Sequence, residues 1–339
     1  MKDIAKHCGV SVATVSKALN NQSDISDETK QKIKNAAKEL GYFPNSSARA
    51  LKTKRSYNIG VLYMEESQGG FTHGYFSGIL QSFRTAVEPT GYCLTFINGT
   101  KKASNMTYYE DCLYRGFDGV LIACANYKDP GVIDLIESEI PVVTIDATFD
   151  SSISVIANNK KGLKDLVNHA IHRGHTNIAF IHGQESEVTS ERVKGYKEAL
   201  SQRGIPIREE YIKKSHYRSY QEAYEYTIEL LTLKERPTCI LYPDDMACFG
   251  GINAIKSRGL YMPEDISVAG FDGYLFSQMM KPTIETVQQD SYNIGRVAGE
   301  ELVKMIETPD LVEQKVFVLD GHLIPGDSVR KFKDRMVDL

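Results

Sequence analysis

Residues 3–20 read Asp-Ile-Ala-Lys-His-Cys-Gly-Val-Ser-Val-Ala-Thr-Val-Ser-Lys-Ala-Leu-Asn. This stretch predicts two short helices that meet at a tight turn at Gly9, with Ser11 as the N-cap of the second helix. Such a pair is a helix-turn-helix, whose second helix lies in the major groove of DNA. Helical spacing predicts an inward side with Val12, Val15, Ala18 and Leu19, and an outward side with Val12, Ala13, Ser16 and Lys17.

A third amphipathic helix is predicted over residues 27–40, because its apolar residues recur on one side. Ser26 is a natural N-cap and Gly41 ends the helix. The sequence then continues through Tyr-Phe-Pro-Asn at 42–45 into a short helical segment, 46–52, with basic neighbours.

Charge is distributed unevenly along the 339 residues, whose net charge is −4. Residues 1–55 hold eleven Lys and Arg against five Asp and Glu, whereas the remainder holds twenty-nine against thirty-nine. A small basic module on a larger acidic body fits a polyanion-binding head and a body with a different task.

Length and cysteine usage narrow the class of protein further. A chain of 339 residues is expected to form two or three domains. We find no long apolar run and no signal peptide, so we expect a protein without a membrane segment. The six cysteines show no Cys-x-x-Cys spacing, which favours a reduced cytosolic protein without structural zinc.

From residue 57 onward, apolar strand-like runs alternate with helical runs. Continuous apolar strands separated by helices predict parallel, doubly wound α/β sheets. The alternation of strand-like and helical runs starts again near residue 158, which indicates two lobes of similar architecture.

Several motifs together resemble the lac repressor and purine repressor family of bacterial transcription factors. They are residues 9–20 quoted above, Gly-Tyr-Phe-Pro-Asn-Ser-Ser-Ala-Arg-Ala-Leu at 41–51, Gly-Phe-Asp-Gly-Val-Leu-Ile at 116–122 and Pro-Glu-Asp-Ile-Ser-Val-Ala-Gly-Phe-Asp at 263–272. The resemblance covers residues 3 to about 327. It implies a small all-α helix-turn-helix headpiece and hinge helix, joined to a two-lobed α/β domain like that of periplasmic sugar-binding proteins.

By this resemblance the headpiece spans 1–44, the hinge helix and linker 45–56, the effector-binding and dimerisation domain 57–330, and the tail 331–339. The N-lobe is expected at about 57–157 and 283–313, and the C-lobe at about 158–282 and 314–330. Crossings between lobes are expected near Ala157, Met280 and Lys315.

The resemblance implies a sequence-specific DNA-binding regulator, a repressor, whose operator affinity is controlled by a small molecule bound between the lobes. The expected partners are palindromic operator DNA, a sugar or other metabolite, and a second copy of the chain, in the cytoplasm and without a cofactor. The identity of the effector, and whether it releases or strengthens DNA binding, stay open. The alternative is a cytosolic sugar receptor without a DNA role.

The resemblance also assigns DNA contacts. Val12 and Ala13 would give apolar contacts that suit thymine methyl groups, and Lys17 would reach a guanine edge or only a phosphate. Leu51 would be a minor-groove wedge, with ordinary helix packing as its alternative role. The remaining DNA candidates are Thr14, Ser16, Ser26, Tyr42, Asn45, Ala48, Arg49 and Lys52.

Candidate effector contacts follow the strands, because open α/β sheets bind ligands beyond the carboxyl ends of their strands. Carboxylates, an amide and an arginine among aromatic faces suit a polyhydroxylated ligand. Asp244 has the alternative role of a helix N-cap. The candidates are Tyr63, Phe71, Tyr75, Asp146, Asn158, Arg192, Asp244, Phe271 and Asp272.

Two segments depart from the family pattern. The chain has Asn158-Asn159 where the family usually has Asp-Asn, and residues 282–290 differ from the usual Pro-x-Leu-Thr-Thr-Val-x-Gln-Pro.

His169, His172 and His175 form the most metal-like run, but Gly174 should end the helix before His175. We find no catalytic motif and predict neither an enzyme nor a metal site.

Overall fold

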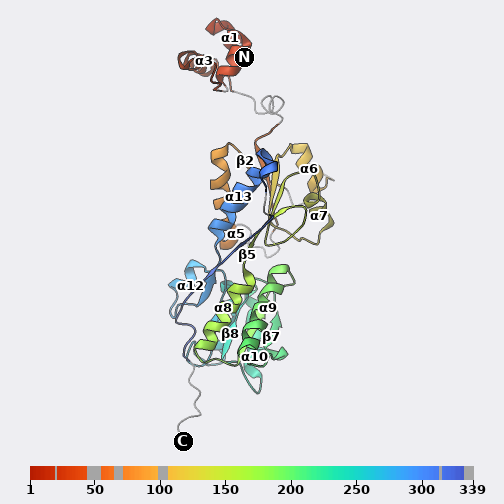
Figure 1. Ribbon diagram of the computed structural model, residues 1–339. Helices are drawn as coiled ribbons and strands as arrows, with labels where there is room; N and C mark the ends of the chain where they lie inside the picture. Colours follow the sequence, from red (N-terminus) through yellow and green to blue (C-terminus); the bar gives the residue numbers. More distant parts are fainter. Residues whose placement is uncertain (20, 44–54, 65–71, 98–105, 313–314, 332–339) are drawn as a thin grey trace. The chain divides into compact units, whose positions relative to one another are not determined.

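The computed structural model describes residues 1–19, 21–43, 55–64, 72–97, 106–312 and 315–331. They form two compact units, 1–57 and 58–339 (Figure 1). Of the predicted hinge helix and tail, residues 45–54 and 332–339 lie outside the described residues.

The first unit contains the predicted helix-turn-helix and third helix, as α1 (Lys2–Cys8), α2 (Val12–Leu19) and α3 (Asp27–Glu39). Gly9 ends α1 in the left-handed conformation, with φ of 69°. Two predicted N-caps are confirmed. Ser11 Oγ accepts from the Thr14 amide at 3.0 Å, and Ser26 Oγ accepts from the Thr29 amide at 3.3 Å.

The core of this unit joins all three helices. Ile4 of α1, Val15 of α2 and Ile33 of α3 are fully buried in one cluster. The prediction that Val12 faces inward is wrong, because its side chain is 42% exposed. Val12 is the first residue of α2, and side chains lean toward the N-terminus of their helix, so this one extends past the helix end instead of into the core.

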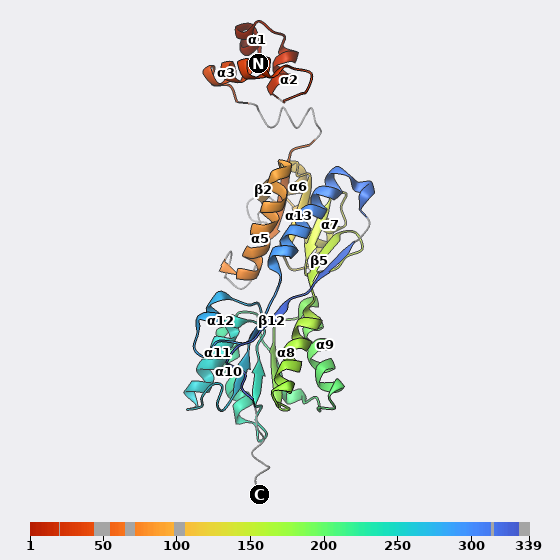
Figure 2. The ribbon, with the colours of Figure 1, turned by 60° about the vertical axis from the view of Figure 1, so that its left-hand side comes forward.

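The second unit has two lobes, each a parallel sheet between two layers of helices (Figure 2). In the first lobe the strand order is β11-β5-β4-β3-β1-β2. Helices α5 and α13 lie side by side on one face, and α6 and α7 cover the other. The elements are β1 (Asn58–Tyr63), α5 (Gly74–Val87), β2 (Cys93–Phe96), α6 (Tyr108–Arg115), β3 (Gly119–Cys124), α7 (Pro130–Ile136), β4 (Val142–Ile145), β5 (Ile153–Ala157), α13 (Ser291–Glu307) and β11 (Val316–Leu319).

The second lobe has the strand order β7-β6-β8-β9. Its strands are buried on both faces, since alternate residues of β6 enter different clusters. Ile178 and Phe180 pack with α8 and α9, whereas Ala179 and Ile181 pack with α10 and α11. The elements are α8 (Asn159–His172), β6 (Ile178–His182), α9 (Glu187–Gln202), β7 (Ile212–Lys214), α10 (Tyr220–Thr232), β8 (Cys239–Leu241), α11 (Asp245–Ser257), β9 (Ser267–Ala269) and α12 (Leu275–Met279).

The expected lobe boundary near Lys315 is wrong. Strand β11 pairs in parallel with β5, so residues 316–319 belong to the first lobe and not to the second. After β11 the chain enters β12 (His322–Ile324), which pairs antiparallel with β10 (Thr286–Gln288). Residues 285 and 288 also bridge to Ala269 and Asp272, which ties β10 to the second lobe, so the expected return to the first lobe at about 283 is wrong as well.

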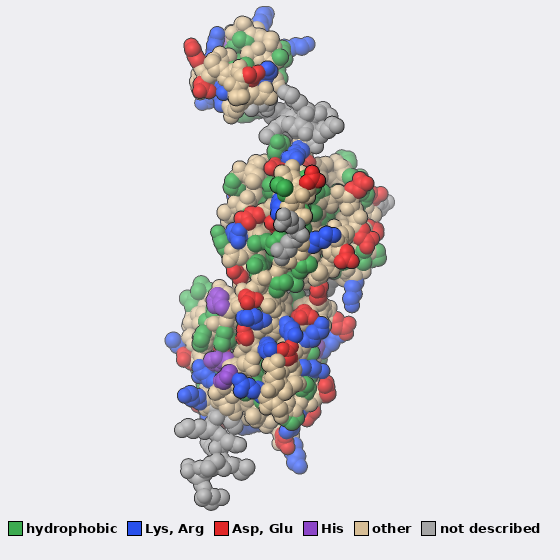
Figure 3. Space-filling model, viewed as in Figure 1, with side chains coloured by type: hydrophobic (Ala, Val, Ile, Leu, Met, Phe, Trp, Pro, Cys, Tyr) green, Lys and Arg blue, Asp and Glu red, His purple; other side chains and the backbone are tan. Residues whose placement is uncertain are grey.

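The second unit carries charges of both signs on its surface, and most of the thiols are buried. Acidic and basic side chains are interspersed on the face of the second unit that Figure 3 shows. The six cysteines all lie among the described residues and form no disulfide bond, and four of them are buried. Among the described residues, no helix has the length and apolar character needed to cross a membrane.

Glu285, next to β10, is a fully buried carboxyl group. Its Oε2 lies 3.2 Å from His169 Nε2, which itself accepts a hydrogen bond from Arg173 Nε at 2.9 Å. Burial raises the pKa of Glu285 from its ordinary value of 4.5 to about 7. The folded protein therefore holds this proton more tightly than the unfolded chain does.

This shift predicts a pH-dependent stability. Between pH 4.5 and about 7 the folded state binds more protons, so the free energy of unfolding falls as pH rises through this window, by up to about 3 kcal/mol. Glu285→Gln should remove that fall and be more stable than the natural chain at pH 8. Urea unfolding at pH 5 and pH 8 measures it, with exposed Glu264→Gln as control. Parallel pH curves for the natural chain and Glu285→Gln would contradict the assignment.

Candidate DNA interface and effector site

The outward side of α2 presents the predicted base contacts. Val12 and Ala13 are exposed at the N-terminal end of this helix, and Thr14 Oγ1 lies 2.8 Å from Ser11 Oγ. Lys17 Nζ pairs with the Asp24 carboxylate, and this hydrogen bond lowers the pKa of Asp24. Because both partners are about half exposed, the pair is weak enough to yield to a phosphate.

Other DNA candidates have structural partners in the headpiece. Ser26 caps α3, and Tyr42 packs against the headpiece core. Ser16 is partly buried on α2. The candidates outside the described residues are Asn45, Ala48, Arg49, Leu51 and Lys52.

Arg192 is the centre of the candidate effector site in the second lobe. Its side chain is buried, and its Nε donates to Asn159 Oδ1 at 2.8 Å. Its Nη1 donates to the Pro243 carbonyl at 2.7 Å, and its Cζ lies 3.7 Å from the Phe271 ring centroid. A guanidinium held from three sides is a rigid, preorganised cation.

Asp272 pairs with this arginine, and Asp244 directly follows the proline whose carbonyl the arginine contacts. Asp272 Oδ1 lies 4.0 Å from Arg192 Nη2 and accepts a hydrogen bond from Gln289 Nε2 at 2.7 Å. Asp244 accepts from the Ala247 and Arg218 amides at 2.8 Å and 2.6 Å, so it also serves as the N-cap of α11. Burial raises the pKa of both carboxyl groups, that of Asp244 to about 6.

The first lobe contributes Tyr75 and Asp146. Tyr75 Oη donates to Asp146 Oδ2 at 2.7 Å, and Asp146 Oδ1 accepts from the Ala157 amide at 3.0 Å. Burial raises the pKa of Asp146, and the hydrogen bonds from Tyr75 and Ala157 partly offset this rise. Tyr75 directly follows Gly74, whose amide donates to Tyr274 Oη in the second lobe at 3.2 Å.

The structure does not bring every candidate to this cluster. Asn158 caps α8, and its Nδ2 donates to Asp320 Oδ1 at 2.8 Å. The neighbouring Asn159 contacts Arg192 instead. Tyr63, in contrast, ends β1 with its ring 5.7 Å from that of Phe76, which in turn lies 5.1 Å from the ring of Tyr75. Phe71 lies outside the described residues.

Sequence reasoning missed Gln289, Asn159 and Tyr217 as members of the site. Gln289 is 7% exposed, and its Oε1 is buried without a hydrogen-bond partner. Tyr217 Oη lies 2.9 Å from Thr189 Oγ1, with its ring 5.5 Å from Arg192 Cζ. Gln289 directly follows β10, in a segment that connects the lobes. The rule that ligands bind beyond the ends of parallel strands applies to the two main sheets, so it did not point to this residue. Its place beside this connecting strand was the available signal.

The three histidines of the metal-like run have separate partners. His175 Nδ1 lies 2.8 Å from Thr238 Oγ1 and its Nε2 lies 3.1 Å from the Arg330 carbonyl. His172 pairs with Arg203, and His169 with Arg173. Within the described ranges, no three His, Cys, Asp or Glu side chains converge as a metal site would require.

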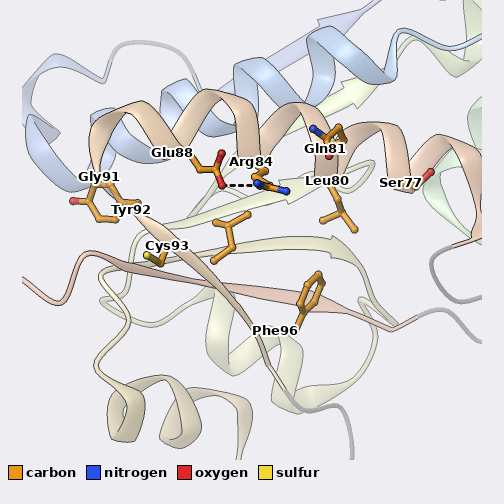
Figure 4. A pocket seen from close by; sticks show the side chains of 10 residues that line it. Ser77, Leu80, Gln81, Arg84, Glu88, Gly91, Tyr92, Cys93 and Phe96 are labelled. Carbon is orange, nitrogen blue, oxygen red and sulfur yellow. Dashed lines mark hydrogen bonds and ion pairs between the residues drawn. The ribbon is translucent and has the colours of Figure 1, made fainter. Parts of the chain in front are cut away.

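A separate groove of about 820 Å³ lies between α5 and the edge strand β2 (Figure 4). Leu80, Leu94 and Phe96 give it apolar walls, and Phe96 is 45% exposed. On α5, Arg84 Nε donates to Glu88 Oε1 at 2.6 Å.

Comparisons with known proteins match both units. The model of the lacI family of bacterial regulatory proteins matches residues 1–45, and that of the periplasmic binding protein-like domain matches residues 167–329. The chain is 33% identical to the probable HTH-type transcriptional repressor ExuR of Bacillus subtilis (strain 168), over 98% of each chain.

Solved structures of two regulators are also similar to this chain over nearly its whole length. The lac repressor dimer bound to operator and the anti-inducer ONPF is similar with a TM-score of 0.82 and 25% identity, over 97% of this chain and 98% of that chain. The complex of the transcriptional regulator CelR with cellobiose is similar with a TM-score of 0.71 and 25% identity, over 96% and 98%.

A helix-turn-helix unit joined to a two-lobed α/β unit defines a transcription factor with an effector-binding domain. The chain belongs to the lacI family of bacterial regulatory proteins. It is a transcriptional repressor and not an enzyme, and a sugar receptor without a DNA role is not favoured.

Proposed function

We propose that a polyhydroxylated small molecule, a sugar, binds between the two lobes and sets the operator affinity of this repressor. The observation that carries this proposal is the buried cluster of Arg192, Phe271 and Asp272 in the second lobe, together with the hydrogen-bonded pair of Tyr75 and Asp146 in the first. Carboxylates accept hydrogen bonds from hydroxyl groups, and aromatic faces cover the apolar face of a sugar ring.

The proposed ligand contacts include the unpartnered Gln289 Oε1, which is a buried acceptor that a ligand hydroxyl can satisfy. Asn159 and Tyr217 border the same arginine. The cellobiose complex of a similar regulator supports a sugar as the ligand class.

On DNA, Val12 and Ala13 would contact thymine methyl groups, and Lys17 a guanine edge or a phosphate. Leu51 would enter the minor groove of a palindromic operator. The proposed backbone and flanking contacts are Thr14, Ser16, Ser26, Tyr42, Asn45, Ala48, Arg49 and Lys52. A repressor with this partner would work in the bacterial cytoplasm.

The proposed homodimer would cover the groove between α5 and β2. Strand β2 is the edge of the first-lobe sheet, and exposed edges with apolar side chains are protected in natural proteins. The lac repressor dimer supports a two-copy arrangement on a palindrome.

A single charge in this groove should separate the dimer. Phe96→Asp would desolvate a carboxylate at the interface, so we expect the dissociation constant of the dimer to rise at least 100-fold. Sedimentation velocity of the full chain measures it. Leu113→Asp on α6, at a site that is 55% exposed, should leave the dimer intact. Equal dissociation constants for Phe96→Asp and the natural chain would move the interface elsewhere.

The function itself is tested in two stages. Selection from a random duplex library at near-physiological salt should recover a palindrome of two half-sites. That duplex then serves as the probe for a panel of neutral and acidic mono- and disaccharides. A sugar that changes operator affinity supports the proposal, whereas a constant operator affinity over the whole panel contradicts the sugar assignment.

A further inference from the structure

The turn that carries Asp272 has an unusual backbone. Asp272 has φ of 100° and Gly273 has φ of 72°. A residue with a side chain rarely adopts such a φ, and it does so where the surrounding structure holds it. Gly273 also packs directly on β10, because a Cβ atom there would lie 2.7 Å from Gln288 Cα.

Two buried side chains hold this turn. Asp245 Oδ2 accepts from the Tyr274 amide at 2.7 Å, and Thr286 Oγ1 accepts from the Gly273 amide at 3.2 Å. The two side chains are joined, since Thr286 Oγ1 donates to Asp245 Oδ1 at 2.7 Å. Asp245 and Thr286 are almost fully buried, which strengthens these hydrogen bonds.

The two ends of the turn face different parts of the protein. Asp272 points to Arg192 and Gln289 in the candidate effector site. Two residues later, Tyr274 Oη accepts from the Gly74 amide at 3.2 Å and lies 3.1 Å from His73 Nδ1. Gly74 begins α5, so this is a contact with the first lobe.

We propose that Asp245 and Thr286 are positioning residues that tie Asp272 to the contact between the lobes. Because the amides of Gly273 and Tyr274 are fixed by one connected pair of side chains, Asp272 and the Tyr274 ring move as a unit. Ligand contact at Asp272 then changes the Tyr274 contact with Gly74. The effector part of this inference rests on the proposed function, whereas the mechanical link does not.

Hydrogen–deuterium exchange of the full-length chain tests the link without any ligand. Thr286→Val keeps the shape of the side chain but removes both of its hydrogen bonds. We expect at least fivefold faster exchange in peptides covering 271–277 and also in peptides covering 72–79, in the other lobe. Thr286→Ser restores the hydroxyl and should restore slow exchange in both.

Tyr274→Phe is the matched second variant, since it removes only the hydroxyl that contacts Gly74. It should speed exchange at 72–79 and leave 271–277 unchanged. Faster exchange in β6 as well would mean that Thr286→Val destabilises the whole second lobe. In that case Asp245→Asn is the variant to use, because the asparagine can place an NH₂ donor against the Tyr274 amide donor and so break this hydrogen bond.

Three results decide the inference. Faster exchange in both segments, reversed by Thr286→Ser, supports it. A change confined to 271–277 would overturn the coupling, and no change in either segment would overturn the role of Thr286. The proposed function fails separately, when no sugar of the panel changes operator affinity.

Discussion

Val12→Asp is expected to weaken operator binding at least 100-fold without unfolding the headpiece. Val12 is 42% exposed at the first position of α2, where the base edges of the major groove would meet it. A carboxylate there faces a polyanion and loses its water, and 100-fold corresponds to about 2.7 kcal/mol. An acidic residue at a helix N-terminus is otherwise favourable, and α2 has none in its first turn.

The measurement is fluorescence anisotropy with the duplex recovered by selection, at about physiological salt, together with a thermal unfolding scan. Asn35→Asp on the exposed side of α3 adds the same charge to the same unit and should cost less than tenfold. If both variants bind alike, the loss is due to net charge and α2 does not read the bases.

The second large effect concerns Asp272. Asp272→Asn should weaken sugar binding by about 100-fold, or about 2.7 kcal/mol, because a hydrogen bond from a ligand hydroxyl to a charged acceptor contributes about 1.5–3 kcal/mol. Asparagine has the same shape and tolerates the left-handed backbone that Asp272 adopts. Operator affinity in the absence of sugar should therefore stay within about twofold.

Isothermal titration calorimetry with the sugar found by the panel gives the affinity, and anisotropy gives the operator response. Asp165→Asn on α8 is the control, since its exposed ion pair with Lys161 contributes little. A full sugar response in Asp272→Asn would show that Asp272 does not contact the sugar. The cluster on which the proposed function rests would then not be the ligand site.

Local features of the fold were readable from sequence. Gly9 at a left-handed helix end and the caps Ser11 and Ser26 act within four residues, so propensity and spacing suffice to predict them. Val12 is the exception, because a first helical residue can turn to either side.

For the candidate site, the sequence predicted which positions take part but not which side chains contact one another. Asp146 directly follows β4, and Asp244 directly precedes α11, so a rule about strand ends finds them. Asn158 was predicted as the amide of the site, yet at the start of α8 Asn158 caps the helix and Asn159 contacts Arg192. A sequence pattern cannot decide which of two adjacent asparagines at a helix start points to the arginine.

The sequence by itself determined the three-helix headpiece, the alternation of buried strands and helices, and the family. Tertiary structure alone decided that β11 completes the first sheet beside β5, which lies about 160 residues earlier, and that Tyr274 reaches Gly74 across the lobes. The reason is physical. Helix caps and periodic apolar faces are fixed by neighbours in the chain, whereas these pairings depend on which distant surfaces remain available once both sheets have packed.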